Sequence, residues 1–385
     1  MNRSSSHTLK LISRENRSDE RHASWLELFF DLVFVVAIAE LAHFLHAHLD
    51  WGGIGTFAAL FIPIWWLWID FSYYADQFDV EQGVYRLVML GIMFGMIVLA
   101  LTIPEALQEG SARFAGVYAG LRLVIVGLYF QAWRLVPEAR ELTGRYTLSF
   151  TIALLFWMVS IVVPPPVRFV LWGIALLIEI SNGPITYATI RSVPVQVSHM
   201  DERFGLFVII VLGEAIVAVA GGVSDIQWQW QETMTAISGF ITAVSLWWLY
   251  FECAETSVIN QALQSNRKRV LLRSYVYGYS HVLLFAGIVA AGVGIQTAIE
   301  GVDRGDLSIA ARTILCGGLG LYLIGLSAVQ WATERSLPNS ILLGRLFAAI
   351  VCFTLIGFGG VLSPVALMSG LTVVFVGLIQ IESQY

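Results

Sequence analysis

The sequence predicts an all-α, polytopic membrane protein with about twelve transmembrane helices. Of the 385 residues, 57% are hydrophobic and only 13% are charged, which is about half the charged fraction of a typical soluble protein. The mean hydropathy is +0.74. Apolar stretches of about 20 residues, the length that crosses a bilayer as a helix, recur along almost the whole chain. This pattern leaves no room for a separate soluble domain beyond a short polar N-terminal tail.

The predicted spans follow one another with mostly short connections, and their limits are set by the apolar runs. The polar N-terminus lacks the apolar run and cleavage site of a signal peptide, so we expect it to be retained. The spans are expected at residues 25–46, 53–75, 84–103, 113–132, 146–163, 167–189, 203–222, 233–253, 272–297, 309–331, 341–361 and 364–382.

The distribution of basic residues predicts the orientation of the chain. If the N-terminus is cytoplasmic, most of the 22 Lys and Arg residues fall in loops and tails on the cytoplasmic side. The opposite side then holds only Arg113, Arg168, Arg304 and Arg312. Because basic residues favour the cytoplasmic side of a membrane, we expect both termini in the cytoplasm, which also requires an even number of spans.

Weak internal similarity predicts two parallel six-helix halves. We divide the chain into an N-terminal tail (1–24), a first half (25–190) and a second half (191–385). Halves with an even number of spans are related by an axis along the membrane normal. Chance similarity among apolar helices is the alternative. The matching features are the aromatic runs 65–70 and 247–252, the glycines Gly120 and Gly127 with Gly318 and Gly325, and the acids Glu27 and Glu40 with Asp201 and Glu214.

Acidic residues inside the spans are the main candidates for function. A carboxylate at the centre of a lipid-facing helix costs roughly 2.5 to 3.5 kcal/mol. In the first span, Glu27 and Asp31 lie on nearly the same helix face, whereas Glu40 shares the opposite side with His43. Glu214 lies in the seventh span. Such acids hold a proton, a cation or a salt bridge, or they fix helix packing.

A single basic residue, Arg122, lies deep within a span, and we expect it to pair with an acid from another helix. That pair is either a structural clamp or an anion or gating site. Asp70, near the end of its span, is expected to pair with a loop arginine. The segment Ser181–Pro184 breaks the sixth span just after Glu179, which is typical of cation sites in transporters and also of plain proline kinks.

Two glycine pairs and the three cysteines are interpreted as structural. Gly91 with Gly95, and Gly116 with Gly120, have the GxxxG spacing that lets helices approach closely. The three cysteines show no disulfide or zinc spacing. The sequence also lacks a phosphate loop, an HExxH motif, a nucleophile elbow and haem-type spacing. We therefore expect no cofactor, no metal and no nucleic-acid partner, and we lean against an enzyme.

Two segments resemble the bacterial low temperature requirement A (LtrA) family. They are WLELFFDLVFV at residues 25–35, preceded by the basic Arg21, and HMDERFGLFVIIVLGE at residues 199–214. The resemblance extends over nearly the whole chain and implies a multi-span bacterial inner-membrane protein linked to growth in the cold. It implies no chemistry for the positions that match the motif. These positions are Glu27, Asp31, His199, Glu202, Arg203 and Glu214.

Together, the residues and the resemblance predict a proton- or cation-linked secondary transporter of unknown substrate. In this hypothesis Asp31 and Glu214 form a polar site near the pseudo-symmetry axis, with Arg122, Glu40 and Glu27 around it. An ion channel with two six-helix repeats, a lipid-modifying membrane enzyme and a structural role in cold membranes are the alternatives. The expected partners are membrane lipids and a proton or small ion.

Overall fold

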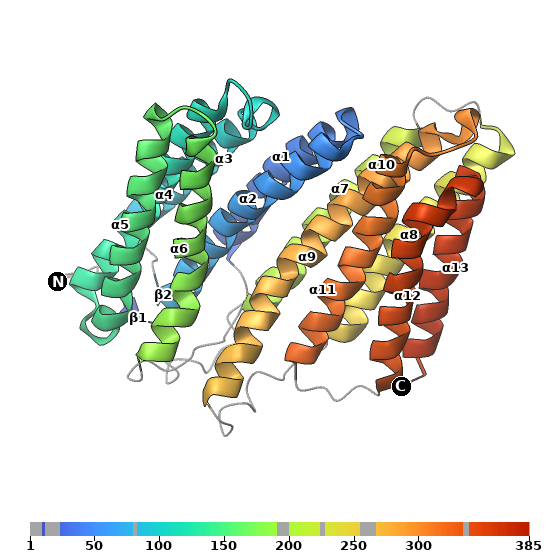
Figure 1. Cartoon of the computed structure of the whole chain (residues 1–385). Helices are drawn as coiled ribbons and strands as arrows, with labels where there is room; N and C mark the ends of the chain where they lie inside the picture. The colour runs from blue at the N-terminus through green and yellow to red at the C-terminus, as the bar shows by residue number, and fades with distance from the viewer. Residues whose placement is uncertain are drawn as a thin grey trace. The chain divides into compact units, whose positions relative to one another are not determined.

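The structure is a computed structural model of the chain, and helices dominate it (Figure 1). Twelve helical spans among the described residues are long and apolar enough to cross a membrane. Such helices satisfy their own backbone hydrogen bonds in hydrocarbon, which confirms the predicted all-helical membrane fold. The described residues are 10–11, 24–79, 83–190, 200–223, 228–254, 267–333 and 339–384.

The helices lie within a few residues of the predicted spans. A two-residue antiparallel pairing joins β1 (Lys10–Leu11) to β2 (Phe78–Asp79). The helices are α1 (Trp25–Ala47), α2 (Trp51–Gln77), α3 (Gly83–Ala100), α4 (Ser111–Leu135), α5 (Arg140–Val162), α6 (Val167–Thr189), α7 (Met200–Val223), α8 (Trp230–Ala254), α9 (Arg267–Glu300), α10 (Ile309–Arg312), α11 (Gly318–Ala332), α12 (Asn339–Phe358) and α13 (Pro364–Glu382). A π-helical segment, Thr313–Gly317, joins α10 to α11, so that the two form one span.

The chain divides into two compact units. The first comprises Met1–Ala37 and Ile62–Arg203, and the second comprises Ile38–Phe61 and Phe204–Tyr385. The helices α1 and α2 therefore each contribute one part to each unit. The division into two six-helix repeats at residue 190 stays a prediction.

In the first unit, α4, α5 and α6 lie side by side (Figure 1) around buried aromatic side chains. The ring centroids of Tyr118 and Trp157 are 4.1 Å apart, and those of Trp157 and Trp172 are 5.3 Å apart. Phe114 lies 5.2 Å from Trp172. These four rings, which we call the aromatic block, fill the space between the three helices in the half nearest the start of α6. Aromatic pairs at these separations add stability beyond the area they bury.

Arg168 forms hydrogen bonds that join α4, α5 and α6 at one end. From the first turn of α6 its Nε donates to the Ser160 carbonyl at 2.8 Å, and its Nη2 donates to the Ile161 carbonyl at 3.2 Å. Its Nη1 donates to the Ser111 hydroxyl at the start of α4. The last carbonyls of a helix lack intrahelical partners, so Arg168 completes the end of α5.

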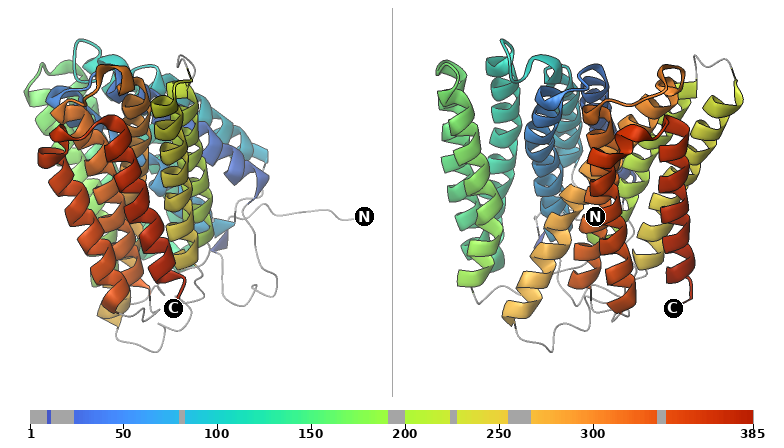
Figure 2. Two further views of the ribbon diagram at one scale, coloured as in Figure 1. Left: turned by 90° about the vertical axis from the view of Figure 1, so that its right-hand side faces the viewer. Right: turned by 45° about the vertical axis from the view of Figure 1, so that its right-hand side comes forward.

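In the second unit, α9 approaches α11 and the π-helical segment before it backbone to backbone. A Cβ added to Gly294 would lie 2.4 Å from the Leu315 Cα, and one added to Gly318 would lie 2.6 Å from the Ala291 nitrogen. Without side chains at these positions the two helices reach the close packing typical of membrane bundles. In both views of Figure 2, α12 and α13 (red) also lie side by side.

The glycine pairs of α3 and α4 do not pack in the expected way. A Cβ added to Gly91, Gly116 or Gly120 would meet no atom within 4 Å, and only Gly95 faces a neighbour, the side chain of Leu121. The GxxxG interpretation is therefore wrong for Gly91, Gly116 and Gly120, and a close approach of α4 is present only at Gly95 among these four glycines. Spacing alone does not reveal which face of a helix has a neighbour.

Replacing Gly287 of α9 with alanine should destabilise the protein. The new Cβ would lie 2.7 Å from both the Gly318 carbonyl oxygen and the Tyr322 backbone nitrogen, so α9 and α11 would have to separate. We expect the free energy of unfolding to fall by about 1 to 3 kcal/mol, the usual cost of overpacking, measured by thermal unfolding in detergent. The matched control is Gly120→Ala, which meets open space. Equal melting of the two variants would contradict this packing.

Candidate functional site

Arg122 is fully buried in the first unit, between two acids from other helices. From α4, its Nη1 donates a hydrogen bond of 2.5 Å to Oδ2 of Asp70 in α2. Its Nε lies 2.9 Å from Oε1 of Glu179 in α6. We call these three residues the Arg122 triad. Because a guanidinium at membrane depth persists only with partners, the prediction that Arg122 pairs with acids of other helices is confirmed.

Aromatic side chains surround the triad. The Arg122 guanidinium carbon lies 4.8 Å from the Phe150 ring centroid in α5, within the range of a cation–π contact. Tyr118, one turn earlier on α4, donates a hydrogen bond of 3.3 Å to the Pro63 carbonyl of α2. Four helices, α2, α4, α5 and α6, therefore converge on one guanidinium.

Asp70 differs from its expected role. We expected it to pair with a loop arginine near the membrane surface, but α2 continues to Gln77, so Asp70 is buried with only 6% of its surface exposed. Its partner is the intramembrane Arg122.

The triad does not balance its own charge. Two carboxylates and one guanidinium carry a net charge of −1 when both acids are ionised, and no other basic side chain pairs with Asp70 or Glu179 among the described residues. An uncompensated charge in a low-dielectric interior is strongly disfavoured. Charge balance is reached when one acid binds a proton or when a small cation joins the site.

The parts of the chain that the structure describes hold no group of three or more His, Cys, Asp and Glu side chains placed to bind a metal ion.

A second buried ion pair joins α1 to the start of α7. Arg203 Nη2 lies 2.7 Å from Oδ1 of Asp31, and the same oxygen accepts a hydrogen bond of 2.8 Å from the Trp68 indole. The guanidinium carbon is 5.9 Å from the ring centroids of Phe30 and Trp68. One carboxylate and one guanidinium cancel, so this Asp31 pair needs no further ion.

Asp31 and Arg203 come from the two sequence segments that resemble the LtrA family, and the fold brings these segments together. Residues 22–380 match the family model described as "Bacterial low temperature requirement A protein (LtrA)". The chain belongs to the LtrA family. It is also similar to "Uncharacterized protein RA0937" of Rhizobium meliloti (strain 1021), with 30% identity over 356 residues, which cover 90% of this chain and 86% of the relative. No solved structure matches the chain significantly. Family membership and the twelve apolar spans together identify a bacterial integral membrane protein.

Of the other LtrA motif positions, Glu27 and Glu202 lie at helix ends, Glu214 lies in the middle of α7, and His199 lies outside the described residues. Glu27 forms a capping box at the start of α1: its Oε2 accepts the Ser24 N–H at 2.7 Å, and its own N–H donates to the Ser24 hydroxyl at 3.3 Å. Glu202 is exposed in the first turn of α7. His199 lies outside the residues that the structure describes. The capping box assigns Glu27 a local structural role.

Glu40 and Glu214 are both half-buried in the second unit. The exposed His43 lies near enough to Glu214 to interact with it electrostatically. Asp31 belongs to the first unit, and Glu214 to the second, so the structure describes each acid only within its own unit. The expected joint site of Asp31 and Glu214 stays a prediction.

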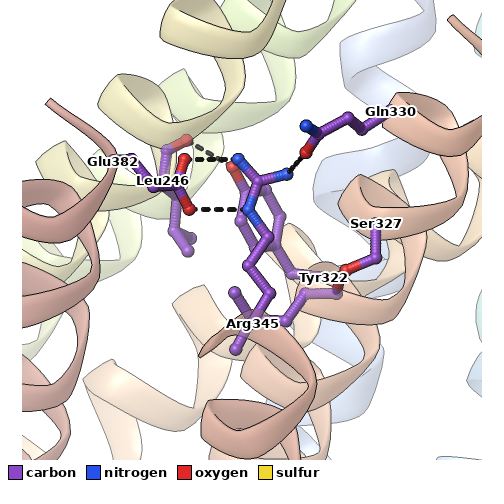
Figure 3. Close-up of polar contacts among 7 residues, drawn as sticks. Leu246, Tyr322, Ser327, Gln330, Arg345 and Glu382 are labelled. Carbon is purple, nitrogen blue, oxygen red and sulfur yellow. Dashed lines mark hydrogen bonds and ion pairs between the residues drawn. The ribbon is translucent and has the colours of Figure 1, made fainter. Parts of the chain in front are cut away.

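The second unit has its own buried arginine. Arg345 of α12 meets the Glu382 carboxylate at the end of α13, with Nε 2.6 Å from Oε1 and Nη2 bonded to Oε2. Its Nη1 donates to the Gln330 side chain of α11, as Figure 3 shows. Nearby, the Tyr322 hydroxyl donates to the Leu246 carbonyl at 2.5 Å. This cluster ties three helix ends together.

Sequence reasoning missed the role of Arg345, whereas for His281 it left a hydrogen-bonded core histidine and a proton relay as alternatives. A signal for Arg345 was present, because it falls inside the predicted span 341–361. The buried His281 of α9 donates from Nδ1 to the Tyr277 carbonyl at 2.7 Å, since a carbonyl only accepts, which leaves Nε2 to accept from the Tyr250 hydroxyl at 3.1 Å. Both ring nitrogens are therefore engaged, as in a structural core histidine.

We expect the Asp31 pair to act as a structural clamp. Each of its two charges serves only to neutralise the other inside the protein. Arg203→Met leaves the Asp31 carboxylate buried without its cation, which should lower the free energy of unfolding by about 3 to 5 kcal/mol. The double variant Asp31→Leu/Arg203→Met should recover most of that loss. Thermal unfolding of both variants in detergent checks this. If the double variant is no more stable than Arg203→Met, the clamp interpretation is wrong.

Proposed function

We propose that this LtrA-family protein is a secondary transporter in which the Arg122 triad binds the coupling ion, a proton or a small cation. The observation that carries the proposal is the buried pairing of one guanidinium with two carboxylates. Ionisable residues inside a membrane protein are costly to keep and are characteristic of ion and proton pathways. A fixed structural clamp needs only one acid for each arginine.

The charge imbalance supplies a physical basis for coupling. With the ion bound, the triad is neutral and is compatible with a closed, dry bundle. Without the ion, the triad carries a net negative charge, which favours a conformation that admits water. Because the triad joins α2, α4 and α6, and Phe150 adds α5, ion binding acts on the packing of four helices at once. An ion that binds two conformations unequally shifts the population between them.

We propose roles for the remaining predicted site residues on the same basis. Asp31 holds α1 against α7 through Arg203 and maintains the packing beside the triad's helices. Glu40 and Glu214, half-buried in the second unit, are proposed to take part in ion or substrate binding there.

We further propose that the protein lies in the inner membrane with both termini in the cytoplasm. The excess of Lys and Arg in the loops and tails of that side supports this orientation. The description of the LtrA family supports a contribution of this activity to growth at low temperature. The similar sequence features of residues 25–190 and 191–385 support two parallel six-helix halves.

Ion flux in proteoliposomes tests the proposed function. Proton, sodium and potassium gradients are imposed in turn on vesicles that contain the wild type or Glu179→Gln. We expect flux that follows one gradient in the wild type and is lost in Glu179→Gln, because the amide leaves the triad neutral without an ion.

The matched control is Glu138→Gln, which makes the same chemical change at an exposed position and should keep the flux. Asp31→Asn and Glu214→Gln, measured in parallel, test the two acids of the predicted joint site. Normal coupled flux in Glu179→Gln would contradict the proposal.

A further inference from the structure

We propose that a buried row of polar side chains on α6, formed by Glu179, Asn182 and Thr186, is the route by which a proton reaches Glu179 from the C-terminal end of that helix. This inference rests on the proposed function and specifies it further. It assigns the proton as the coupling ion and Glu179 as the group that carries it.

The three side chains form a continuous polar face. Their spacing of three and then four residues places them on one side of an α-helix. All are buried, with exposed fractions of 1% for Glu179, 5% for Asn182 and 2% for Thr186. The Thr186 hydroxyl donates to the Asn182 side-chain oxygen at 3.1 Å. Buried polar groups in a membrane helix need a reason, and three in a row define a polar path through apolar surroundings.

One donor in the row is unused. The Asn182 Nδ2 is buried and has no hydrogen-bond partner among the described residues. An unmet buried donor is costly, whereas a water molecule that enters the row would relieve it. Asn182 is also one turn from Glu179, so water held there lies between the carboxylate and Thr186. The row therefore favours entry of water up to Glu179.

The row ends one turn before α6 does, and Thr186 is followed by the exposed Thr189 and by Ile190, which is buried against Leu142. Thr189, the last residue of α6, is exposed and accepts a hydrogen bond from the Arg145 guanidinium of α5. A proton taken from water at this end moves along water molecules held by Thr186 and Asn182. It then forms an O–H bond on Glu179, which neutralises the triad, and it leaves by the reverse steps.

The opposite side of Glu179 is filled by aromatic side chains. Toward the start of α6 the same face continues as Ala175 and Trp172, both buried. Trp172 belongs to the aromatic block, in which Tyr118 and Trp157 stack at 4.1 Å. The Trp172 indole is fixed by a hydrogen bond of 3.0 Å to the Ser160 hydroxyl. The packed rings of the aromatic block fill the space on this side, so we expect a proton to reach Glu179 from the other end of the row.

The chemistry of the row favours a proton over a metal cation. Small cations require several oxygen ligands at once, whereas the row offers one carboxylate, one amide and one hydroxyl along a line. Asp70 accepts a hydrogen bond from Arg122, and it lies on α2, outside the row. Glu179 is the acid of the triad that lies both at Arg122 and in the row.

Hydrogen–deuterium exchange of the Glu179 carboxyl group tests the route without relying on transport. The C=O infrared band of a protonated carboxyl shifts when its hydrogen becomes deuterium, and the Glu179 band is identified by its loss in Glu179→Gln. After a switch to D2O, we expect Asn182→Leu and Thr186→Val to slow this shift roughly tenfold, the effect of losing a hydrogen-bonding group on the route.

Two controls keep this test decisive. Thr151→Val makes the same chemical change at a threonine that bonds only the carbonyl of its own helix, and it should leave the exchange rate unchanged. Thr186→Ser, which keeps the hydroxyl, should keep the wild-type rate.

Unchanged exchange in Asn182→Leu and Thr186→Val, or a Glu179 carboxyl that gives no protonated band, would overturn the inference. Loss of flux in Glu179→Gln with unchanged exchange in the row variants would overturn only the route, whereas normal flux in Glu179→Gln would overturn the proposed function.

Discussion

A guanidinium held at membrane depth between two carboxylates is the interaction on which the first unit depends. Arg122 fixes the facing sides of α2, α4 and α6, and the Phe150 ring brings α5 to the same point. Apolar helices in lipid gain little from the hydrophobic effect when they associate, so polar contacts and close packing must choose their neighbours. A single buried charge therefore organises the helices and at the same time creates the site.

The contrast between Arg122 and Arg203, two buried arginines of the first unit, explains why Arg122 is the candidate ion site. Among the described residues, Arg203 forms an ion pair with one carboxylate, that of Asp31. In the second unit, Arg345 pairs with Glu382. The Asp31 pair is neutral and holds α1 to α7 without a further ion. Arg122 meets two acids, so its charge balance depends on something that can arrive and leave. A structural clamp and an ion site can therefore contain the same residue types. They differ in the number of acids that pair with the arginine.

The sequence predicts well those features of the fold that depend only on residues close together in the chain. Span length and hydropathy are properties of consecutive residues, so the twelve helices could be placed from the sequence alone. That Arg122 needs an acidic partner also follows from a single residue and its position within a span. Which acids are its partners cannot be predicted in this way, because Asp70 and Glu179 reach Arg122 through the packing of three helices. For the same reason Arg203 was predicted only as a motif position, and its contact with Asp31 was not foreseen.

The most direct test of the account is the number of protons that the triad binds. Purified protein in detergent is moved from alkaline to neutral pH, and proton uptake is measured with a pH indicator in the wild type and in Glu179→Gln. The account predicts that the wild type takes up one more proton per chain than Glu179→Gln, because the variant has lost the group that neutralises the triad. Equal uptake by the two proteins would contradict the claim that Glu179 carries the coupling proton beside Arg122.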